Sequence, residues 1–364
     1  MKRILTINPG STSTKLAIYE DDHLADSQTL RHSVHELAPF KRIVDQYSFR
    51  NQVIQSFLQQ KGRRVQDFDA VIGRGGLVRP IPSGTYLIQE EMLDDLRSGR
   101  YGEHASNLGA LIAHEIVKDT DIPCFIADPV VVDEMGSLAR YSGHPRFERK
   151  SIFHALNQKA TARMASQEIG KPYEAINLVV VHLGGGISIG AHEYGKVIDV
   201  NNALDGDGPF SPERCGTVPV TQLIDLCFSG KYTFEEMKKK VKGDGGIISY
   251  LNTNDGLEVG RRILTGDEQA LVVFKAMAHQ VIKWIGKMAA VLKGQVHGIV
   301  LTGGLAYDQD YMVPWIKEGV EFIAPVFVFP GGDEERALAM AALRVLRKEQ
   351  KPKIYLEEVF DDQR

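Results

Sequence analysis

The chain has 364 residues, of which 43% are hydrophobic and 25% charged, so it can bury a large core and is long enough for two domains. Its formal net charge of −4 is spread without long runs, which argues against nucleic acid as a partner. No charged and apolar leader precedes the first predicted strand, and basic residues interrupt the most apolar long segment, so we expect a cytoplasmic protein with no membrane partner.

The first predicted element is a β-hairpin with a polar turn. Apolar runs at 4–7 and 16–19 flank the sequence Asn8-Pro9-Gly10-Ser11-Thr12-Ser13-Thr14-Lys15. This turn offers hydroxyls and unhindered backbone N–H groups, the donors that a polyphosphate needs, and Lys15 adds a positive charge. Because a strand follows the turn, and not a helix, the segment is neither a Walker loop nor a dinucleotide loop. A solvated hairpin tip is the alternative interpretation.

Several polar side chains further along stand at the ends of predicted elements. Helical spacing at 34–49 and 51–60 predicts two surface helices, and a buried strand then runs into a glycine-rich loop at Arg74. Asp128 similarly ends a short predicted strand, and His154 lies where the next helix opens. Ligands bind at strand ends in α/β sheets. Each residue also has a structural interpretation: a solvated arginine, a turn-forming aspartate and a core histidine.

The opening pattern recurs after a polar segment at 141–150, which is the candidate domain boundary. A buried strand at 176–183 leads into Gly184-Gly185-Gly186, and 187–192 alternates like a returning strand. We interpret this as a second phosphate-binding hairpin, since no helix opens there and the dinucleotide spacing is incomplete. Two such hairpins, each heading one half of the chain, imply two related domains that face each other across a cleft holding nucleotide phosphates.

The remaining segments are rich in glycine. A long loop at 201–219 carries Arg214 and three carboxylates, and loops of that length are usually functional or disordered. A buried strand at 297–302 ends in Thr-Gly-Gly, where the backbone can approach a flat ligand such as adenosine. Glu334 follows the last strand and precedes the last helix. An acidic residue in a first helical turn is ordinarily a dipole partner.

Together these segments resemble the acetate and butyrate kinase family, within the superfold of actin, sugar kinases and heat-shock chaperones. The resemblance rests on 8–15, on His182-Leu183-Gly184-Gly185-Gly186 and on Leu301-Thr302-Gly303-Gly304, and it covers nearly the whole chain. It implies an α/β fold with two duplicated actin-like (ribonuclease H-like) domains around an ATP cleft. Residues 1–148 plus 336–364 would form an N-terminal domain with the acyl-substrate side, and 149–335 a nucleotide-binding domain.

Among family members, the chain looks most like the butyrate kinases, with Asn-Pro-Gly-Ser-Thr in the first hairpin and Ser211-Pro212-Glu213-Arg214 in the long loop. It departs from the acetate kinases at Arg74-Gly75-Gly76, where they have arginine and two valines, and at Cys215-Gly216-Thr217, where they have Ser-Gly-Asp. The resemblance implies reversible transfer of the ATP γ-phosphoryl group, with Mg²⁺, to butyrate or a similar short-chain or branched acid. The implied assembly is a homodimer or a multiple of dimers.

Residue roles carry over by motif position. Arg74 and Arg214 would hold the carboxylate and the phosphoryl group in transfer, and His154 would donate to that group. Asn8, Asp128 and Glu334 would place substrate, ATP and Mg²⁺, with Glu334 at the metal. The residues expected to bind the nucleotide are Ser11, Thr12, Ser13, Lys15, His182, Gly184, Gly185, Gly186, Gly303 and Gly304.

The substrate class leaves alternatives. Gly76 in place of a valine, with Phe153 as the remaining wall, would make room for acids longer than acetate. Acetate or propionate kinase activity is the alternative within the family. A carboxylate with a pKa near that of Glu, about 4.3, is ionised at neutral pH and needs no base, whereas a sugar or polyol kinase would need Asp128 or Asp207 as a base. A non-enzymatic ATP-driven switch would carry a further domain, which we do not expect here.

Overall fold

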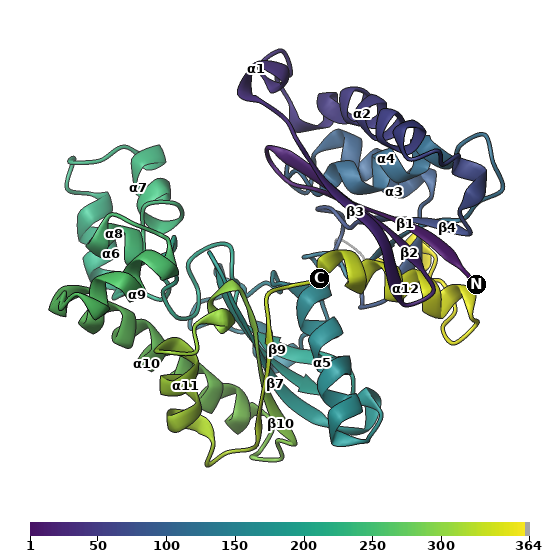
Figure 1. Ribbon diagram of the computed structural model, residues 1–364. Coiled ribbons are helices and arrows are strands. Elements are labelled where there is room, and N and C mark those ends of the chain that lie inside the picture. The colour runs from purple at the N-terminus through teal and green to yellow at the C-terminus, as the bar shows by residue number, and fades with distance from the viewer. Residues whose placement is uncertain (361–364) are drawn as a thin grey trace. The chain divides into compact units, whose positions relative to one another are not determined.

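The computed structural model describes residues 1–360, which form two units (Figure 1). Unit 1 comprises Met1–Asp133 and the C-terminal segment from Asp333, and unit 2 comprises Glu134–Gly332. The sequence analysis places these boundaries later, after 148 and after 335.

Local pairing explains the earlier boundary after Asp133. The carboxylate of Glu134 accepts a hydrogen bond from Lys159 Nζ at 2.6 Å, and the N–H of Gly136 donates to the carbonyl of Ile198 at 2.9 Å. Lys159 lies on a helix of unit 2 (Ala155–Ile169) and Ile198 lies on a strand of the sheet of unit 2 (Lys196–Val200). The segment after Asp133 is therefore anchored in unit 2.

Unit 1 is built on a six-stranded sheet with the order β3-β2-β1-β4-β6-β5. β1, β2 and β3 form an antiparallel meander, β1, β4 and β6 are parallel, and β5 is antiparallel to β6. Nearly every residue of the parallel strands is buried, as expected for strands covered on both faces. The strands are β1 (Arg3–Pro9), β2 (Ser13–Glu20), β3 (His23–Arg31), β4 (Ala70–Arg74), β5 (Thr85–Leu87) and β6 (Cys124–Ala127).

The first predicted helix of unit 1 is interrupted. Instead of one helix over 34–49, the structure has a single turn, α1, a short 3₁₀ segment (Ile43–Gln46), and α2. Pro39 explains the break, because it has no N–H to donate and its ring clashes with the carbonyl four residues earlier in a continuing helix. The helices are α1 (Val34–Leu37), α2 (Tyr47–Gln60), α3 (Glu90–Ser98), α4 (Asn107–Val117), α12 (Glu334–Leu346) and α13 (Tyr355–Glu358).

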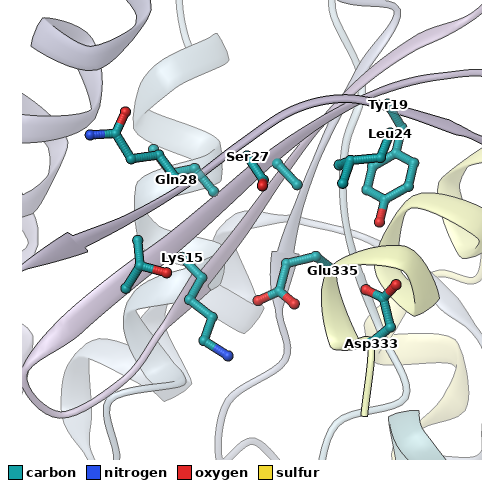
Figure 2. A pocket seen from close by; sticks show the side chains of 10 residues that line it. Lys15, Tyr19, Leu24, Ser27, Gln28, Asp333 and Glu335 are labelled. Atoms are coloured by element: carbon teal, nitrogen blue, oxygen red, sulfur yellow. The ribbon is translucent and has the colours of Figure 1, made fainter. Parts of the chain in front are cut away.

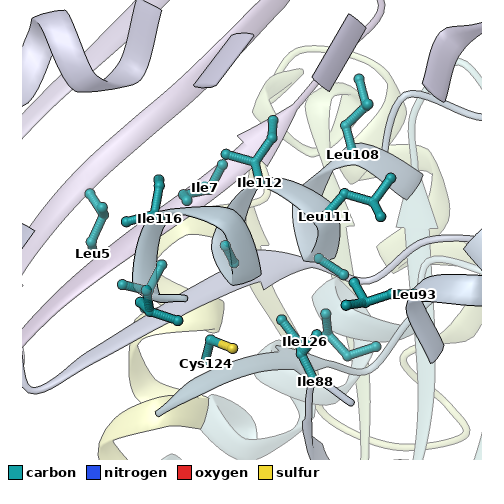
Figure 3. Packing of buried hydrophobic residues seen from close by; sticks show 14 of the residues in the cluster. Leu5, Ile7, Ile88, Leu93, Leu108, Leu111, Ile112, Ile116, Cys124 and Ile126 are labelled. Atoms are coloured by element: carbon teal, nitrogen blue, oxygen red, sulfur yellow. The ribbon is translucent and has the colours of Figure 1, made fainter. Parts of the chain in front are cut away.

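The core of unit 1 positions the end of β4. Figure 3 shows Ile116 of α4 beside Leu5 of β1, and Ile112 beside Ile7, within one cluster of buried apolar side chains. α4 approaches β4 most closely at Gly109, where a Cβ would lie 2.8 Å from the backbone nitrogen of Arg74. Glycine therefore allows the helix to seat directly behind the strand end that carries this arginine.

α12 joins unit 1 although it comes late in the chain. It packs against β1, β2 and β4, and Figure 1 shows it in yellow beside these N-terminal strands. Glu334, which the predicted boundaries assign to the nucleotide-binding domain, therefore lies in unit 1.

Unit 2 repeats the same topology with five strands in the order β11-β10-β7-β8-β9. β7, β8 and β9 form an antiparallel meander, and β10 lies parallel to both β7 and β11. Each unit thus begins with a three-stranded meander and adds parallel strands beside its first strand, which confirms the predicted duplicated α/β fold. The strands are β7 (Asn177–Leu183), β8 (Ile187–Glu193), β9 (Lys196–Val200), β10 (Gly298–Gly303) and β11 (Val326–Pro330).

Helices cover both faces of the second sheet. Val179 and Val181 of β7 pack in the cluster that includes α10, whereas the alternating residues Leu178 and Val180 pack against α5. Among residues 1–360, none of the helices has the length and apolar character needed to cross a membrane. The helices of unit 2 are α5 (Ala155–Ile169), α6 (Val220–Cys227), α7 (Phe234–Val241), α8 (Ile247–Leu251), α9 (Gly256–Leu264), α10 (Glu268–Val291) and α11 (Met312–Val320).

Candidate functional site

The turn between β1 and β2 is hydrogen-bonded to Arg50 of α2. This side chain has no exposed surface, and its Nη1 donates to the carbonyls of Gly10 and Ser13, both at 2.8 Å, while Nη2 donates to that of Ser11 at 2.9 Å. Burial lowers the pKa of Arg50 to about 10, which leaves it charged at neutral pH. The turn carbonyls are therefore bound to a buried cation, and the turn lies in its positive potential.

Arg50 was not predicted as a site residue, because it lies between the two surface helices predicted at 34–49 and 51–60. The signal was present in the helical spacing, because Arg50 lies on the same face as Ile54 and Phe57, which are both buried. An arginine on an apolar helix face has to find buried acceptors. Here the acceptors lie about 40 positions away in the chain, in the hairpin.

The predicted phosphate-binding residues of the turn have the accessibility that the role requires. Ser11 and Thr12 are exposed and Ser13 is half-buried. Lys15 is exposed on β2 and pairs in register with Asn8. The hydroxyls and the ammonium group are thus available to an anion, while the turn carbonyls are occupied.

Lys15 also lines an open pocket of about 390 Å³ between β2, β3 and the start of α12. Figure 2 shows its side chain extending into the same space as the carboxylates of Asp333 and Glu335. Tyr19 stands at the far side, where burial, with Asp333 and Glu335 as further causes, raises its pKa, so it is protonated at neutral pH. The pocket combines one cation, two carboxylates and several hydroxyls.

Asn8, Arg74 and Glu334 form a hydrogen-bonded cluster at one edge of the first sheet. Asn8 Nδ2 donates to Glu334 Oε2 at 2.8 Å and to Glu335 Oε1 at 2.9 Å. Arg74 Nη1 donates to Glu334 Oε2 at 2.9 Å and to Asn8 Oδ1 at 3.3 Å. The side chains of Arg74 and Glu334 are 23% and 22% exposed, so the ion pair is accessible to a ligand. Glu334 is therefore more than a partner of the helix dipole.

The fit of Mg²⁺ to this cluster rests on two carboxylates. Glu334 and Glu335 converge on one amide nitrogen of Asn8, and carboxylate oxygens are the ligands that Mg²⁺ prefers. Within residues 1–360, no three or more His, Cys, Asp or Glu side chains gather closely enough to hold a metal. Mg²⁺ is commonly bound by one or two carboxylates together with substrate phosphates, so the pair fits a metal that arrives with ATP.

Asp128 follows the next parallel strand at the same edge. Gly73 is in register with Ile7, and Arg74 with Ala127, so Asn8, Arg74 and Asp128 all lie at the carboxyl ends of neighbouring strands. Asp128 has a φ of 38° and is 8% exposed. Its Oδ1 accepts hydrogen bonds from Ser83 Oγ at 2.6 Å and from the N–H of Gly84 at 2.8 Å. This oxygen therefore closes the loop that follows Arg74.

Gly76 does not border an open space in unit 1. A Cβ at this position would lie 2.6 Å from Asn107 Cα and 2.8 Å from Leu96 Cδ2. A valine side chain would enter the packed interior beneath α4, so close packing, and not an enlarged acyl pocket, accounts for this glycine. Phe153, the other residue expected to wall the pocket, is 2% exposed and lies in unit 2.

In unit 2, the glycine turn between β7 and β8 is joined to the long loop. The guanidinium of Arg214 lies against Gly186, where it leaves no room for a Cβ, and donates to the carbonyl of Ala203. Ser211 Oγ donates to the carbonyl of Gly185 at 2.6 Å. Burial lowers the pKa of Arg214, and the carboxylates of Glu213 and Asp205 oppose this. The structure thus brings together Arg214 and Gly184–Gly186, which the sequence places far apart.

Gly303 and Gly304 lie at the end of β10. Gly303 has a φ of 87° and exchanges two backbone hydrogen bonds with Gly331, at 2.7 and 2.8 Å. A Cβ on Gly303 would collide with the backbone of Leu183, whereas one on Gly304 would meet no atom within 4 Å. Gly303 is thus required by packing, and Gly304 faces open space where a ligand can approach.

His154 and His182 stack face to face in unit 2. Their ring centroids are 3.7 Å apart with an interplanar angle of 9°. His154 immediately precedes α5 and its Nδ1 lies 2.9 Å from Ser188 Oγ, while His182 lies on β7 with its Nδ1 2.6 Å from Asn157 Oδ1. His154 is half-buried and in contact with a second predicted site residue. The sequence analysis missed both hydrogen-bond partners.

The repeated meander and parallel strands define the class as an α/β protein with a duplicated fold. An acetate kinase from Porphyromonas gingivalis has a TM-score of 0.80 at 18% identity, covering 95% of this chain and 100% of its own. A propionate kinase from Francisella tularensis subsp. tularensis SCHU S4 has a TM-score of 0.74 at 17% identity, with 94% and 99% covered. An acetate kinase from Entamoeba histolytica has a TM-score of 0.75 at 16% identity, with 96% and 99% covered.

A sequence match lies within unit 2. Residues 145–324 match the model of the Acetokinase family. The chain therefore shares the fold of the acetate kinase structures, and the segment 145–324, which carries His154, His182 and Arg214, is similar in sequence to the Acetokinase family.

Proposed function

We propose that the protein is a carboxylate kinase that transfers the γ-phosphoryl group of ATP to butyrate or a similar short-chain or branched acid, reversibly giving an acyl phosphate and ADP. The observation that carries this proposal is the cluster at the strand ends of unit 1, where Arg74 and Asn8 offer N–H donors beside the carboxylates of Glu334 and Glu335. The family match of residues 145–324 supports the same reaction.

The chemistry requires anion binding more than proton abstraction. A fatty acid is ionised at neutral pH, so its oxygen can attack without a base, but it is repelled by the ATP phosphates. Arg74 would bind the carboxylate through its planar set of donors, and Arg214 and His154 would donate to the oxygens of the phosphoryl group in transfer. Bound between Glu334, Glu335 and ATP, Mg²⁺ would neutralise phosphate charge.

The nucleotide would be bound by backbone and small side chains. The glycine turn at 184–186, with His182 beside it, would bind ATP phosphates, and Gly304 leaves room for adenosine. In unit 1, Ser11, Thr12 and Lys15 would donate to phosphate oxygens from the turn that Arg50 anchors. Exclusion of water from the loaded site would protect the mixed anhydride from hydrolysis.

Two aspartates argue against a sugar or polyol kinase. Asp128 Oδ1 is occupied by Ser83 and Gly84, as described above. Asp207 Oδ1 accepts from the N–H of Gly208 at 2.8 Å, and its Oδ2 accepts from that of Asn202 at 3.2 Å. A general base needs an oxygen directed at the substrate hydroxyl, whereas both oxygens of Asp207 are bound within its own loop and Oδ1 of Asp128 is bound by the loop that follows Arg74. This favours an acceptor that is already ionised.

A hydroxamate assay with ATP, Mg²⁺ and a series of acids tests the proposal. We expect acyl hydroxamate from butyrate and isobutyrate at a higher kcat/KM than from acetate, because the first hairpin and the long loop look most like those of the butyrate kinases. A preference for acetate or propionate would replace butyrate with the alternative within the family. ADP release with glucose or glycerol, and none with any acid, would overturn the proposal. The assembly, for which we propose a homodimer or a multiple of dimers, can be measured by light scattering.

A further inference from the structure

We propose that two separate hydrogen-bond networks hold the stacked histidines of unit 2 in opposite tautomers, with the proton of His154 on Nε2 and that of His182 on Nδ1. Gln158 and Asn157, one turn into α5, are then positioning residues that act through these rings. The catalytic consequence rests on the proposed function, whereas the tautomers themselves do not.

The first network reaches His154 through Ser188. Gln158 Nε2 lies 3.0 Å from the backbone carbonyl of Ser188 and 2.8 Å from its Oγ. A carbonyl can only accept, so this amide end is the NH₂ group, and its second hydrogen donates to Ser188 Oγ. The backbone N–H of His154 approaches the same Oγ at 3.5 Å. With these donors on its lone pairs, the serine hydroxyl directs its own hydrogen to His154 Nδ1 at 2.9 Å.

The orientation of Gln158 is itself fixed from deeper in the unit. Its Oε1 lies 2.9 Å from His192 Nε2, and the other ring nitrogen of His192 lies 2.7 Å from the hydroxyl of Tyr173. His192 is fully buried, and burial lowers its pKa well below 6.5, so the ring is neutral. Since Oε1 can only accept, His192 carries its proton on Nε2 and accepts from Tyr173. The hydrogen bonds therefore all run in one direction, and each group donates to the next in the order Tyr173, His192, Gln158, Ser188 and His154.

The second network imposes the reverse arrangement on His182. Thr302 Oγ1 donates to the carbonyl of Gly331 at 2.8 Å, so it accepts from Asn157 Nδ2 at 3.3 Å. This places Asn157 Oδ1 against His182 Nδ1 at 2.6 Å, and an amide oxygen requires a donor there. With its proton on Nδ1, the ring of His182 has its lone pair on Nε2 when it is neutral, and Nε2 lies 3.0 Å from the position of a Cβ on Gly184.

The two rings therefore have different chemical capacities although they stack in parallel. His154 presents an N–H, which can donate to a phosphoryl oxygen and keep its proton throughout the transfer. His182 presents a lone pair beside the glycine turn, which can accept from a hydroxyl, from a metal-bound water or from a protonated phosphate.

The tautomers can be measured directly in the free protein. We would label the full chain with ¹⁵N-histidine and record long-range ¹H–¹⁵N spectra, assigning the two rings with His154→Gln and His182→Gln. The expected result is a protonated Nε2 with an unprotonated Nδ1 in His154, and the reverse in His182. A protonated Nδ1 in neutral His154, or the same tautomer in both rings, would overturn the proposal whether or not the protein is a kinase.

Gln158→Glu should reverse the tautomer of His154. A carboxylate at this position can only accept, so the Ser188 hydroxyl turns toward it and His154 Nδ1 must donate to Ser188. Asn157→Asp is the matched control, because its carboxylate still accepts from His182 Nδ1 and leaves the tautomer of His154 unchanged. Movement of the His154 proton in Gln158→Glu alone is the expected result. Movement in neither variant, or in both, would contradict the network.

Ser188→Ala provides a second variant if Gln158→Glu does not fold. It removes the hydroxyl that lies 2.9 Å from Nδ1, so the single His154 tautomer should become a mixture, and an unchanged tautomer would contradict the proposal. In kinetics, Ser188→Ala should lower kcat by ten-fold or more with less than a three-fold change in KM for ATP. A mixed tautomer with unchanged kcat would remove the catalytic consequence and leave the tautomer assignment intact.

Discussion

Replacing Arg50 with methionine removes the buried cation that anchors the first hairpin while keeping a side chain of similar length. Three hydrogen bonds from Arg50 to turn carbonyls are lost. Hydrogen bonds to a charged group contribute about 1.5–3 kcal/mol each, but the exposed end of the turn regains water and the burial of the cation is itself costly. We therefore expect the unfolding free energy of unit 1 to fall by about 3–5 kcal/mol, with a higher KM for ATP.

The two units provide an internal control for this measurement. Both tryptophans, Trp284 and Trp315, lie in unit 2, so their fluorescence in urea reports that unit, whereas far-UV circular dichroism reports both. Arg50→Met should shift the dichroism transition and leave the fluorescence transition in place. Arg64→Met, at a side chain that is 80% exposed, should change stability by less than about 0.5 kcal/mol. A loss below about 1 kcal/mol in Arg50→Met, or an equal loss in both variants, would refute the anchoring role.

Three further predictions address the site and its pH dependence. Arg74→Ala should reduce kcat/KM for the acid by about 10²–10³ with the fold intact, and activity close to that of Arg64→Ala would exclude the carboxylate-binding role. Glu334→Gln keeps the contact with Asn8 but loses a metal ligand, so it should raise the Mg²⁺ concentration needed for half-maximal rate, and an unchanged titration would contradict that role. The pKa of His192 is lower in the folded protein than its ordinary value of 6.5, so the unfolded chain binds more protons below that pH and stability falls as pH drops, by up to about 1.4 kcal/mol per unit. His192→Gln should flatten this slope between pH 6.5 and 5 in thermal melts, and an unchanged slope would show that other groups cause it.

The sequence reveals the parts of the site that depend on local pattern. A strand, a polar turn and a returning strand are readable from alternation and glycine content, so both hairpins and the strand-end residues Asn8, Arg74 and Asp128 were predicted. The register of parallel strands then brings these three residues to one edge of the sheet. This step also follows from strand order, because the carboxyl ends of parallel strands share an edge.

Contacts between distant segments could not be read in the same way. Arg50 lies about 40 positions from the turn that it supports, with two strands between them, and Gln158 and Asn157 look like ordinary polar residues of a surface helix. At position 76, by contrast, a role was predicted that the packing does not support. Gly76 was interpreted as making room for substrate, whereas close packing requires a glycine there. What a Cβ at this position would contact depends on where α4 lies, which no local pattern specifies.

The direct test of the central claim is a ³¹P NMR spectrum of the protein with ATP, Mg²⁺ and butyrate. The account predicts an acyl phosphate resonance that grows in equal amount with ADP, and that is lost in Arg74→Ala and retained in Arg64→Ala. ADP that accumulates with inorganic phosphate and without acyl phosphate, in protein that is folded and saturated with butyrate, would contradict the assignment of this chain as a carboxylate kinase.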